Sequence, residues 1–151
     1  YPSRQELPLR AESAQATLKD IGIEVDINCT ADNNSILEDP TAWDVYAMAN
    51  VQAPTGDPEY WFTVFATSDA TKNSGKYSSA KLDELEAQLS KEFDNDKRAE
   101  LAVQMQQTIL DDNAFVFCSF LKMSMISRSN VTGYESHACD YYQVTADLDI
   151  N

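Results

Sequence analysis

The first hydrophobic pattern along the chain has the period of a helix. Apolar residues recur at spacings of three and four from Leu7 to Ile21, which predicts an amphipathic helix. Proline is tolerated only in the first turn of a helix, so Pro8 places the start near residues 5–7. Gly22 is the expected residue just beyond the helix end, because glycine readily adopts a positive φ.

Four other segments have the composition of strands. Residues 23–27 alternate apolar and acidic side chains, which predicts a half-buried strand. Residues 43–49 (WDVYAMA) and 115–121 (FVFCSFL) are apolar enough to lie inside a sheet, and residues 141–150 (YYQVTADLDI) form a plausible last strand. One short helical turn is expected near residues 35–38. The chain therefore has a βαβ-like opening and a mixed α/β character.

Two more helical patterns occupy the second half of the chain. The apolar sets are Leu82, Leu85, Leu89 and Phe93, and then Leu101, Ala102, Met105 and Ile109. Asp94 is the expected N-cap of the later helix. The turn DNDK, residues 94–97, is short, so the two helices are predicted to form an antiparallel pair. Residues 67–79 are small and polar, which predicts a surface loop.

The character of the chain changes at residues 50–58 (NVQAPTGDP), which predicts a boundary between two structural regions. Asp57 followed by Pro58 is a strong helix-start signal, with a capping acceptor before a residue of fixed φ. The helix that follows is unusually aromatic, and Trp61 and Phe65 are predicted to face the core. Ligand pockets favour a loop at a strand end beside aromatic side chains, so this stretch is the most informative for function.

The composition excludes several classes of function. The 151 residues are 43% hydrophobic, and the net charge of −14 repels phosphate backbones and anionic membranes. We therefore expect no binding to nucleic acid or to a membrane surface. Such a charge suits cationic or neutral ligands, and it equally suits a solvated surface with no ligand role. No apolar run approaches the ~20 residues that a membrane span needs.

Catalytic chemistry is hard to build from these residues. His137 is the only histidine, and no nucleotide-binding, nucleophile-elbow or zinc-protease motif is present. His137 and Cys139 supply two metal ligands at most, so an ordinary loop is favoured there over a metal site. Carboxylate pairs such as Asp111 and Asp112 carry little information in so acidic a chain. The sequence predicts no enzyme, no cofactor and no metal ligand.

Cysteine usage does not identify a cellular compartment. Three cysteines occur, and none of them lies in a CxxC pair: Cys29, Cys118 and Cys139. Because their number is odd, no disulfide framework is predicted, and at most one bridge can form.

Six segments in order carry a resemblance to a known family. They are AQATLKDIGIEVDI (14–27), WDVYAMAN (43–50), TGDPEYWFTVF (55–65), GKYSSAKLDELEAQL (75–89), DKRAELAVQMQQTILDDNAFVF (96–117) and YYQVTADLDI (141–150). Their order and spacing resemble the C-terminal part of the family 5 extracytoplasmic solute-binding proteins. These proteins serve ABC importers of oligopeptides, dipeptides and nickel.

The resemblance implies an α/β fold, as a C-terminal fragment of a periplasmic-binding-protein-like structure (type II, cluster C) with a mixed sheet and packed helices. Residues 1–50 would end the second lobe, residues 51–58 would form a hinge at the cleft, and residues 59–151 would return to the first lobe. We therefore expect a leader or lipid anchor, most of the first lobe and the start of the second lobe to precede this chain.

The implied function is the substrate-binding component of an ABC importer, outside the cytoplasm, with permease subunits as partners and a lipid anchor as the membrane attachment. The expected ligand is an oligopeptide or dipeptide, or nickel in a metallophore chelate. The alternative is a stand-alone acidic module that contacts another protein. The candidate ligand-binding residues carried over by position are Asn50, Gln52, Pro54, Thr55, Gly56, Asp57 and Tyr60.

Within that set, the backbone groups of Thr55 and Gly56 are expected to pair with the ligand, whereas Asp57 either contacts the ligand or only caps its helix. Two departures from nickel-type members are visible. Residues 51–56 hold no aromatic side chain, and residues 66–76 hold no histidine. Direct ligation of nickel by a histidine is therefore in doubt.

Overall fold

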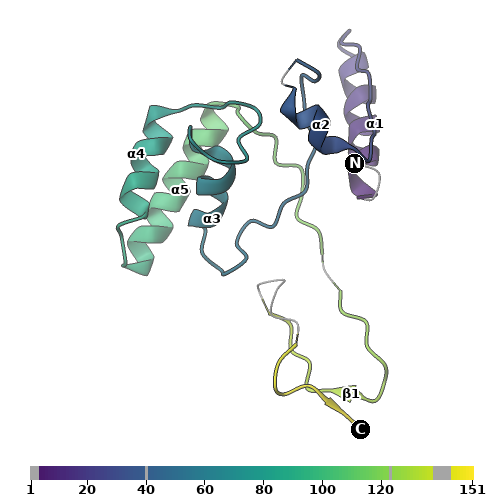
Figure 1. Cartoon of the computed structure of the whole chain (residues 1–151), viewed down its shortest axis with the longest axis vertical. Helices are drawn as coiled ribbons and strands as arrows, with labels where there is room; N and C mark the ends of the chain where they lie inside the picture. The colour runs from purple at the N-terminus through teal and green to yellow at the C-terminus, as the bar shows by residue number, and fades with distance from the viewer. Residues whose placement is uncertain (1–3, 40, 123, 138–143) are drawn as a thin grey trace. The chain divides into compact units, whose positions relative to one another are not determined.

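The structure is a computed structural model that describes residues 4–39, 41–122, 124–137 and 144–151 (Figure 1). The chain divides into two compact units, one of residues 1–51 and one of residues 52–151. The assignment of such units to two lobes, and of residues 51–58 to a hinge, stays a prediction. Within the described residues, no helix has both the length and the apolar character that a membrane crossing requires.

The first unit begins with helix α1, Glu6–Lys19, which starts within the predicted residues 5–7. Its end is closed as predicted by Gly22, whose φ is +83°. The Gly22 N–H donates to the carbonyl of Lys19, and the Ile23 N–H donates to the carbonyl of Leu18, both at 3.0 Å. This pair of bonds is the Schellman motif, in which glycine avoids the strain that a Cβ would add.

Helix α2, Asn33–Glu38, is the short helical turn that was predicted near residues 35–38. The Asn33 side-chain amide donates to the Tyr46 hydroxyl at 3.1 Å. The Tyr46 ring packs on Trp43 with ring centroids 5.8 Å apart. These contacts join α2 to residues 43–46 of the same unit. Among the described residues of the unit, only Leu7 is a buried apolar side chain, so the apolar face of α1 is largely uncovered.

The predicted strands at residues 23–27 and 43–49 are wrong for this structure, because neither segment has a strand partner among the residues that the structure describes. Val45, predicted to lie inside a sheet, has 88% of its surface exposed. A strand exists only when a neighbour accepts and donates its backbone hydrogen bonds. In residues 23–27 the Val25 carbonyl accepts instead from a side chain, the Gln15 amide, at 2.6 Å.

The core of the second unit is the helix pair α4, Ala80–Leu89, and α5, Asn95–Asp111, which lie side by side (Figure 1). The fully buried side chains are Leu82, Leu89, Met105 and Ile109. The predicted apolar stripes are therefore confirmed except at Phe93, which lies beyond the end of α4 and is 91% exposed. The DNDK sequence mostly begins α5, and residues 90–94 make the turn. Asp94 caps α5 as predicted, accepting from the N–H groups of Asp96 and Lys97 at 3.1 Å.

The aromatic helix after Pro58 has two parts. Helix α3, Glu59–Trp61, continues into η1, Phe62–Ala66, where the winding widens to a π-helix and the Thr67 N–H donates to the Phe62 carbonyl at 3.0 Å. Phe65 is buried as predicted, whereas Trp61 is half-buried and packs on the edge of the core.

Residues 67–79 form neither helix nor strand, but the prediction of a plain surface loop is wrong at Thr67 and Asn73, which are buried. The Asn73 side-chain amide donates to the carbonyls of Thr67 at 3.1 Å and Tyr77 at 2.6 Å. Its side-chain oxygen accepts from the Tyr77 N–H at 3.0 Å. One buried amide thus adds three hydrogen bonds to the backbone turns of this segment, such as the one from the Ala70 N–H to the Thr67 carbonyl at 3.0 Å.

The described residues contain one two-stranded sheet, in which β1, Val131–Thr132, pairs antiparallel with β2, Asp149–Ile150. A Cβ at Gly133, whose φ is +76°, would collide with the carbonyl of Asp147, so this turn requires glycine. The predicted strand 115–121 is absent, and Val116 is 88% exposed. The predicted last strand is reduced to β2, with residues 141–143 outside the described residues.

The expected mixed sheet is therefore not found in the part of the chain that the structure describes, and helices dominate there. The cause is the same for each missing strand, since an apolar extended segment needs a second strand beside it. Cys29 and Cys118 are free and exposed. Cys139 lies outside the described residues.

Candidate functional site

The segment predicted to border a ligand is residues 51–58, and its residues 52–57 form a turn at the start of the second unit. Gly56 has a φ of +82°, and its N–H donates to the carbonyl of Ala53 at 3.0 Å. Pro54 is buried beneath the turn, while Thr55 and Gly56 are exposed. The turn therefore exposes Thr55 and Gly56 to the solvent, and the pairing of their backbone groups with a ligand stays a prediction.

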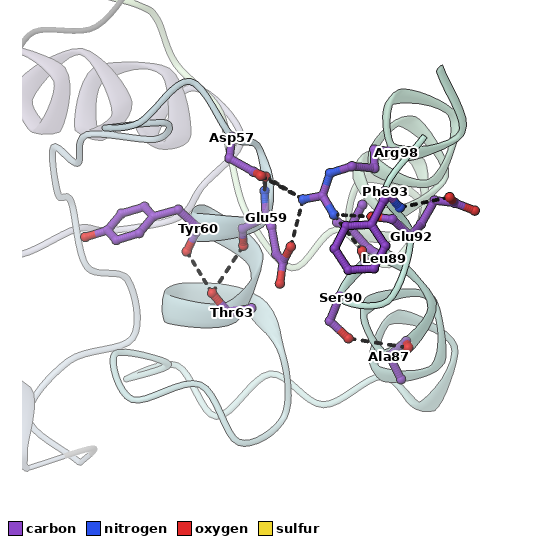
Figure 2. Close-up of polar contacts among 10 residues, drawn as sticks. All are labelled: Asp57, Glu59, Tyr60, Thr63, Ala87, Leu89, Ser90, Glu92, Phe93 and Arg98. Carbon is purple, nitrogen blue, oxygen red and sulfur yellow. Dashed lines mark hydrogen bonds and ion pairs between the residues drawn. The ribbon is translucent and has the colours of Figure 1, made fainter. Parts of the chain in front are cut away.

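Asp57 fixes the boundary between this turn and α3 (Figure 2). Its Oδ1 accepts from the Glu59 N–H at 2.9 Å, which confirms the predicted capping role. Pro58 follows with a helical φ of −68°, as expected for the first helical position. Both carboxylate oxygens of Asp57 also accept from Nη2 of Arg98 at 2.8 Å.

Arg98, near the start of α5, joins three parts of the second unit (Figure 2). Its Nη2 also donates to Oε2 of Glu59 at 2.8 Å. Its Nη1 donates to the carbonyls of Leu89 at 2.7 Å and Glu92 at 2.8 Å. The Arg98 side chain is only 16% exposed. The planar guanidinium suits this task, because it offers several donors in fixed directions to acceptors on different segments.

The charges of this cluster stabilise one another. Partial burial pushes the pKa of Asp57 upward, but the hydrogen bonds from the Glu59 N–H and from Arg98 outweigh burial, so the pKa is lowered. The hydrogen bond to Glu59, followed by the one to Asp57, raises the pKa of Arg98. Asp57 is therefore ionised at neutral pH and is paired with Arg98, which it shares with Glu59.

An open depression of about 360 Å³ lies between the turn and the first turns of α5. It is lined by Thr55, Gly56, Asp57, Pro58, Asn95, Arg98 and Ala99. The turn contributes exposed backbone to one wall of the depression. Helix α5 contributes the Arg98 guanidinium to the other wall, and this guanidinium is already paired with carboxylates. This arrangement offers main-chain hydrogen-bonding groups, and one guanidinium is shared by the two carboxylates of Asp57 and Glu59.

Aromatic side chains form a second feature of the same unit. Trp61 packs on Phe65, Phe115 and Phe117, with ring centroids 6.2, 5.2 and 5.6 Å apart. Phe115 also meets Tyr77 edge to face at 6.1 Å. These rings explain why Phe115 packs on the helix pair although its predicted strand does not form.

The structure brings three of the predicted site residues together, since Thr55, Gly56 and Asp57 line the depression. Gln52, Pro54 and Tyr60 belong to the same unit but do not line it, and the exposed Asn50 belongs to the first unit. A ligand role for all seven stays a prediction. Among the described residues, no group of three His, Cys, Asp or Glu side chains is arranged to hold a metal ion.

Sequence reasoning missed the α5 wall of the depression, namely Asn95, Arg98 and Ala99. Arg98 lies 41 residues from Asp57, so no local spacing signals their pairing. The one available signal was an arginine in the first turn of α5, where a cation is disfavoured by the helix dipole. A cation in that place indicates acceptors in the tertiary structure that compensate for it.

No protein-family model and no curated protein matches the sequence. Among solved structures, the chain is similar to NikA from Staphylococcus aureus, solved in complex with Ni(L-His)2. The match covers 98% of this chain with a TM-score of 0.76 and 23% sequence identity. It covers 32% of the NikA chain, so the chain spans about a third of the length of that protein. The likeness shows that these residues have the fold of the corresponding part of NikA.

Proposed function

We propose that the chain is part of a solute-binding protein that delivers its ligand to an ABC importer outside the cytoplasm. Residues 52–57 border the ligand in this proposal, and the permease subunits of the importer are the protein partners. The single observation that carries the proposal is the fold shared with NikA over 98% of this chain. The ordered series of six sequence segments supports the same family independently of that fold.

The unpaired extended segments add support. Residues 23–27, 43–49 and 115–121 carry strand-like apolar patterns but have no strand partner among the described residues. Because the match covers only 32% of NikA, a longer protein of that fold has ample polypeptide to pair with them. In that setting, exposed side chains such as Val45 and Val116 become buried sheet residues.

The site chemistry favours a ligand that forms hydrogen bonds with the main chain of the turn. The exposed residues Thr55 and Gly56 offer main-chain groups there, apart from the Gly56 N–H that donates within the turn, and both oxygens of Asp57 already accept from Arg98. Such groups recognise peptide backbones or the amide and carboxylate groups of a chelator. Nickel would therefore enter as a complex with a small organic carrier. NikA was solved with a complex of this class, nickel with L-histidine.

The test is native mass spectrometry of the full-length protein that contains this chain, purified from rich medium. We expect a bound mass equal to a peptide or to a nickel chelate. A protein that carries neither, and that binds neither when they are added, contradicts the proposal. The alternative of a stand-alone acidic interaction module predicts instead that these 151 residues occur without further lobes and form a stable complex with another protein.

A matched calorimetric measurement uses the 151 residues alone. We expect no heat of binding with a dipeptide or with the nickel–L-histidine complex, because only one wall of the proposed cleft is present. Binding in the micromolar range by these residues alone would contradict the placement of the ligand between two lobes.

A further inference from the structure

Arg98 is a residue that sequence reasoning did not select, yet it holds the proposed ligand segment in place. Its Nη2 donates to both oxygens of Asp57 and to Glu59 at 2.8 Å. Its Nη1 donates to the carbonyls of Leu89 and Glu92 at the end of the helix pair. One guanidinium thus connects the turn at residues 52–57 to the most buried part of the second unit (Figure 2).

The Arg98 guanidinium is held firmly because its hydrogen-bond acceptors on both sides are themselves held in place. Leu89 is fully buried at the end of α4, so its carbonyl is held by the core. Asp57 is held in turn by its bond to the Glu59 N–H. Charge-assisted hydrogen bonds of this kind are stronger than neutral ones. Thr55 and Gly56 directly precede Asp57 in the chain, so the position of their backbone depends on the bonds between Asp57 and Arg98.

We propose that Arg98 is a positioning residue, which presets the Thr55–Gly56 backbone for the ligand, and that its pairing removes Asp57 from ligand recognition. This inference rests on the proposed function. It narrows the ligand chemistry, because a carboxylate whose two oxygens already accept from a guanidinium is a poor receptor for an amino group. The ligand is then recognised at this turn through its neutral hydrogen-bonding groups, and Asp57 does not bind a positively charged group of the ligand.

The first test measures amide hydrogen exchange on the chain itself and needs no ligand. In Arg98→Gln, we expect the amides of Gly56 and Glu59 to exchange about tenfold faster or more, as loss of a charge-assisted hydrogen bond implies. The amides of Met105 and Ile109 should keep their protection. Arg98→Lys should give an intermediate rate, since lysine keeps the charge but lacks the planar fork.

Lys97→Gln is the matched control, because it removes the same charge from the neighbouring exposed position. Its exchange rates should equal those of the wild type. Equal rates at Gly56 and Glu59 in the wild type and in Arg98→Gln would overturn the positioning role.

The second test uses the full-length protein and the variant Asp57→Asn, in which asparagine still caps the helix. Two probes are compared, a dipeptide with a free amino group and the same dipeptide acetylated. We expect the ratio of their Kd values to be the same in both proteins. A selective loss of about tenfold or more for the free-amine dipeptide would overturn the inference about Asp57.

Failure of the proposed function gives a different result. A full-length protein that binds neither dipeptide nor the nickel–L-histidine complex contradicts the ligand role of the turn and the inference about Asp57 with it. The exchange rates in Arg98→Gln still decide whether Arg98 positions the turn.

Discussion

Asn73 organises a loop that the sequence alone suggested was plain surface, and the substitution Asn73→Asp tests this directly. The change keeps the size and shape of the side chain but removes its two N–H donors. Those donors now reach the carbonyls of Thr67 at 3.1 Å and Tyr77 at 2.6 Å. Asn73 is 7% exposed, so water cannot readily replace them.

The cost follows from the two lost bonds. Each intramolecular hydrogen bond contributes about 0.5–1.5 kcal/mol, and a buried acceptor left without a donor costs about 1–3 kcal/mol. The Thr67 carbonyl keeps the Ala70 N–H as a donor at 3.0 Å, so the second cost applies to the Tyr77 carbonyl. The introduced carboxylate also faces two carbonyl oxygens. We expect Asn73→Asp to lower the free energy of unfolding by about 3 kcal/mol at pH 7, a large share of the ~5–15 kcal/mol typical of a domain.

The loss in free energy of unfolding caused by Asn73→Asp should depend on pH in one direction. Burial and the nearby carbonyls disfavour the charged form, so the native-state pKa of the introduced carboxyl is above the ~3.9 of an unfolded chain. The native state then binds that proton more tightly than the unfolded state does. The difference in free energy of unfolding between the variant and the wild type is therefore largest at pH 7 and shrinks as the pH falls toward 4.

Urea unfolding at several pH values, followed by circular dichroism, measures this difference. Asn95→Asp is the control, because Asn95 is exposed in the first turn of α5, where an added carboxylate is neutral or favourable. Equal urea midpoints for Asn73→Asp and the wild type at pH 7 would show that the two hydrogen bonds donated by Asn73 do not stabilise the protein. A loss in free energy of unfolding that does not change with pH would contradict the effect expected of the introduced charge.

Three further substitutions test the second unit. Met105→Ala removes a fully buried side chain and should cost about 2–5 kcal/mol in urea unfolding, whereas Val103→Ala, at 62% exposure, should cost less than about 0.5 kcal/mol. Asp94→Ala removes the cap of α5 and should cost about 1 kcal/mol, with Asp94→Asn close to the wild type. The pKa of Glu86 is raised by burial and then by nearby carboxylates, so its ionised form weakens the native state. Glu86→Gln should therefore raise the urea midpoint at pH 7, with a gain that disappears toward pH 4.

The helices were predictable because each one carries its own evidence. The stripe that includes Leu82 and Leu89, and the stripe that includes Met105 and Ile109, meet their packing partners within about 30 residues of sequence. Caps are equally local, as Asp94 and Gly22 show. The π-helical winding of η1 gave no such signal, because its pattern of apolar positions matches that of an ordinary helix.

The strands failed for the opposite reason, since a strand depends on a partner that the pattern does not specify. Val45 and Val116 lie in segments with suitable composition and no neighbour among the described residues. As with the helices, the site was predictable only where the signal was local in sequence. The cap at Asp57 was local and was recognised, whereas Arg98 depends on tertiary packing and was missed.

The most direct test of the central claim is amide hydrogen exchange of the full-length protein with and without the nickel–L-histidine complex, and again with a dipeptide. We expect one of these ligands to slow exchange at the amides of Gln52, Ala53, Thr55 and Gly56, while the amides of α5 stay unchanged. Saturating ligand that protects other segments and leaves residues 52–57 unchanged would contradict it.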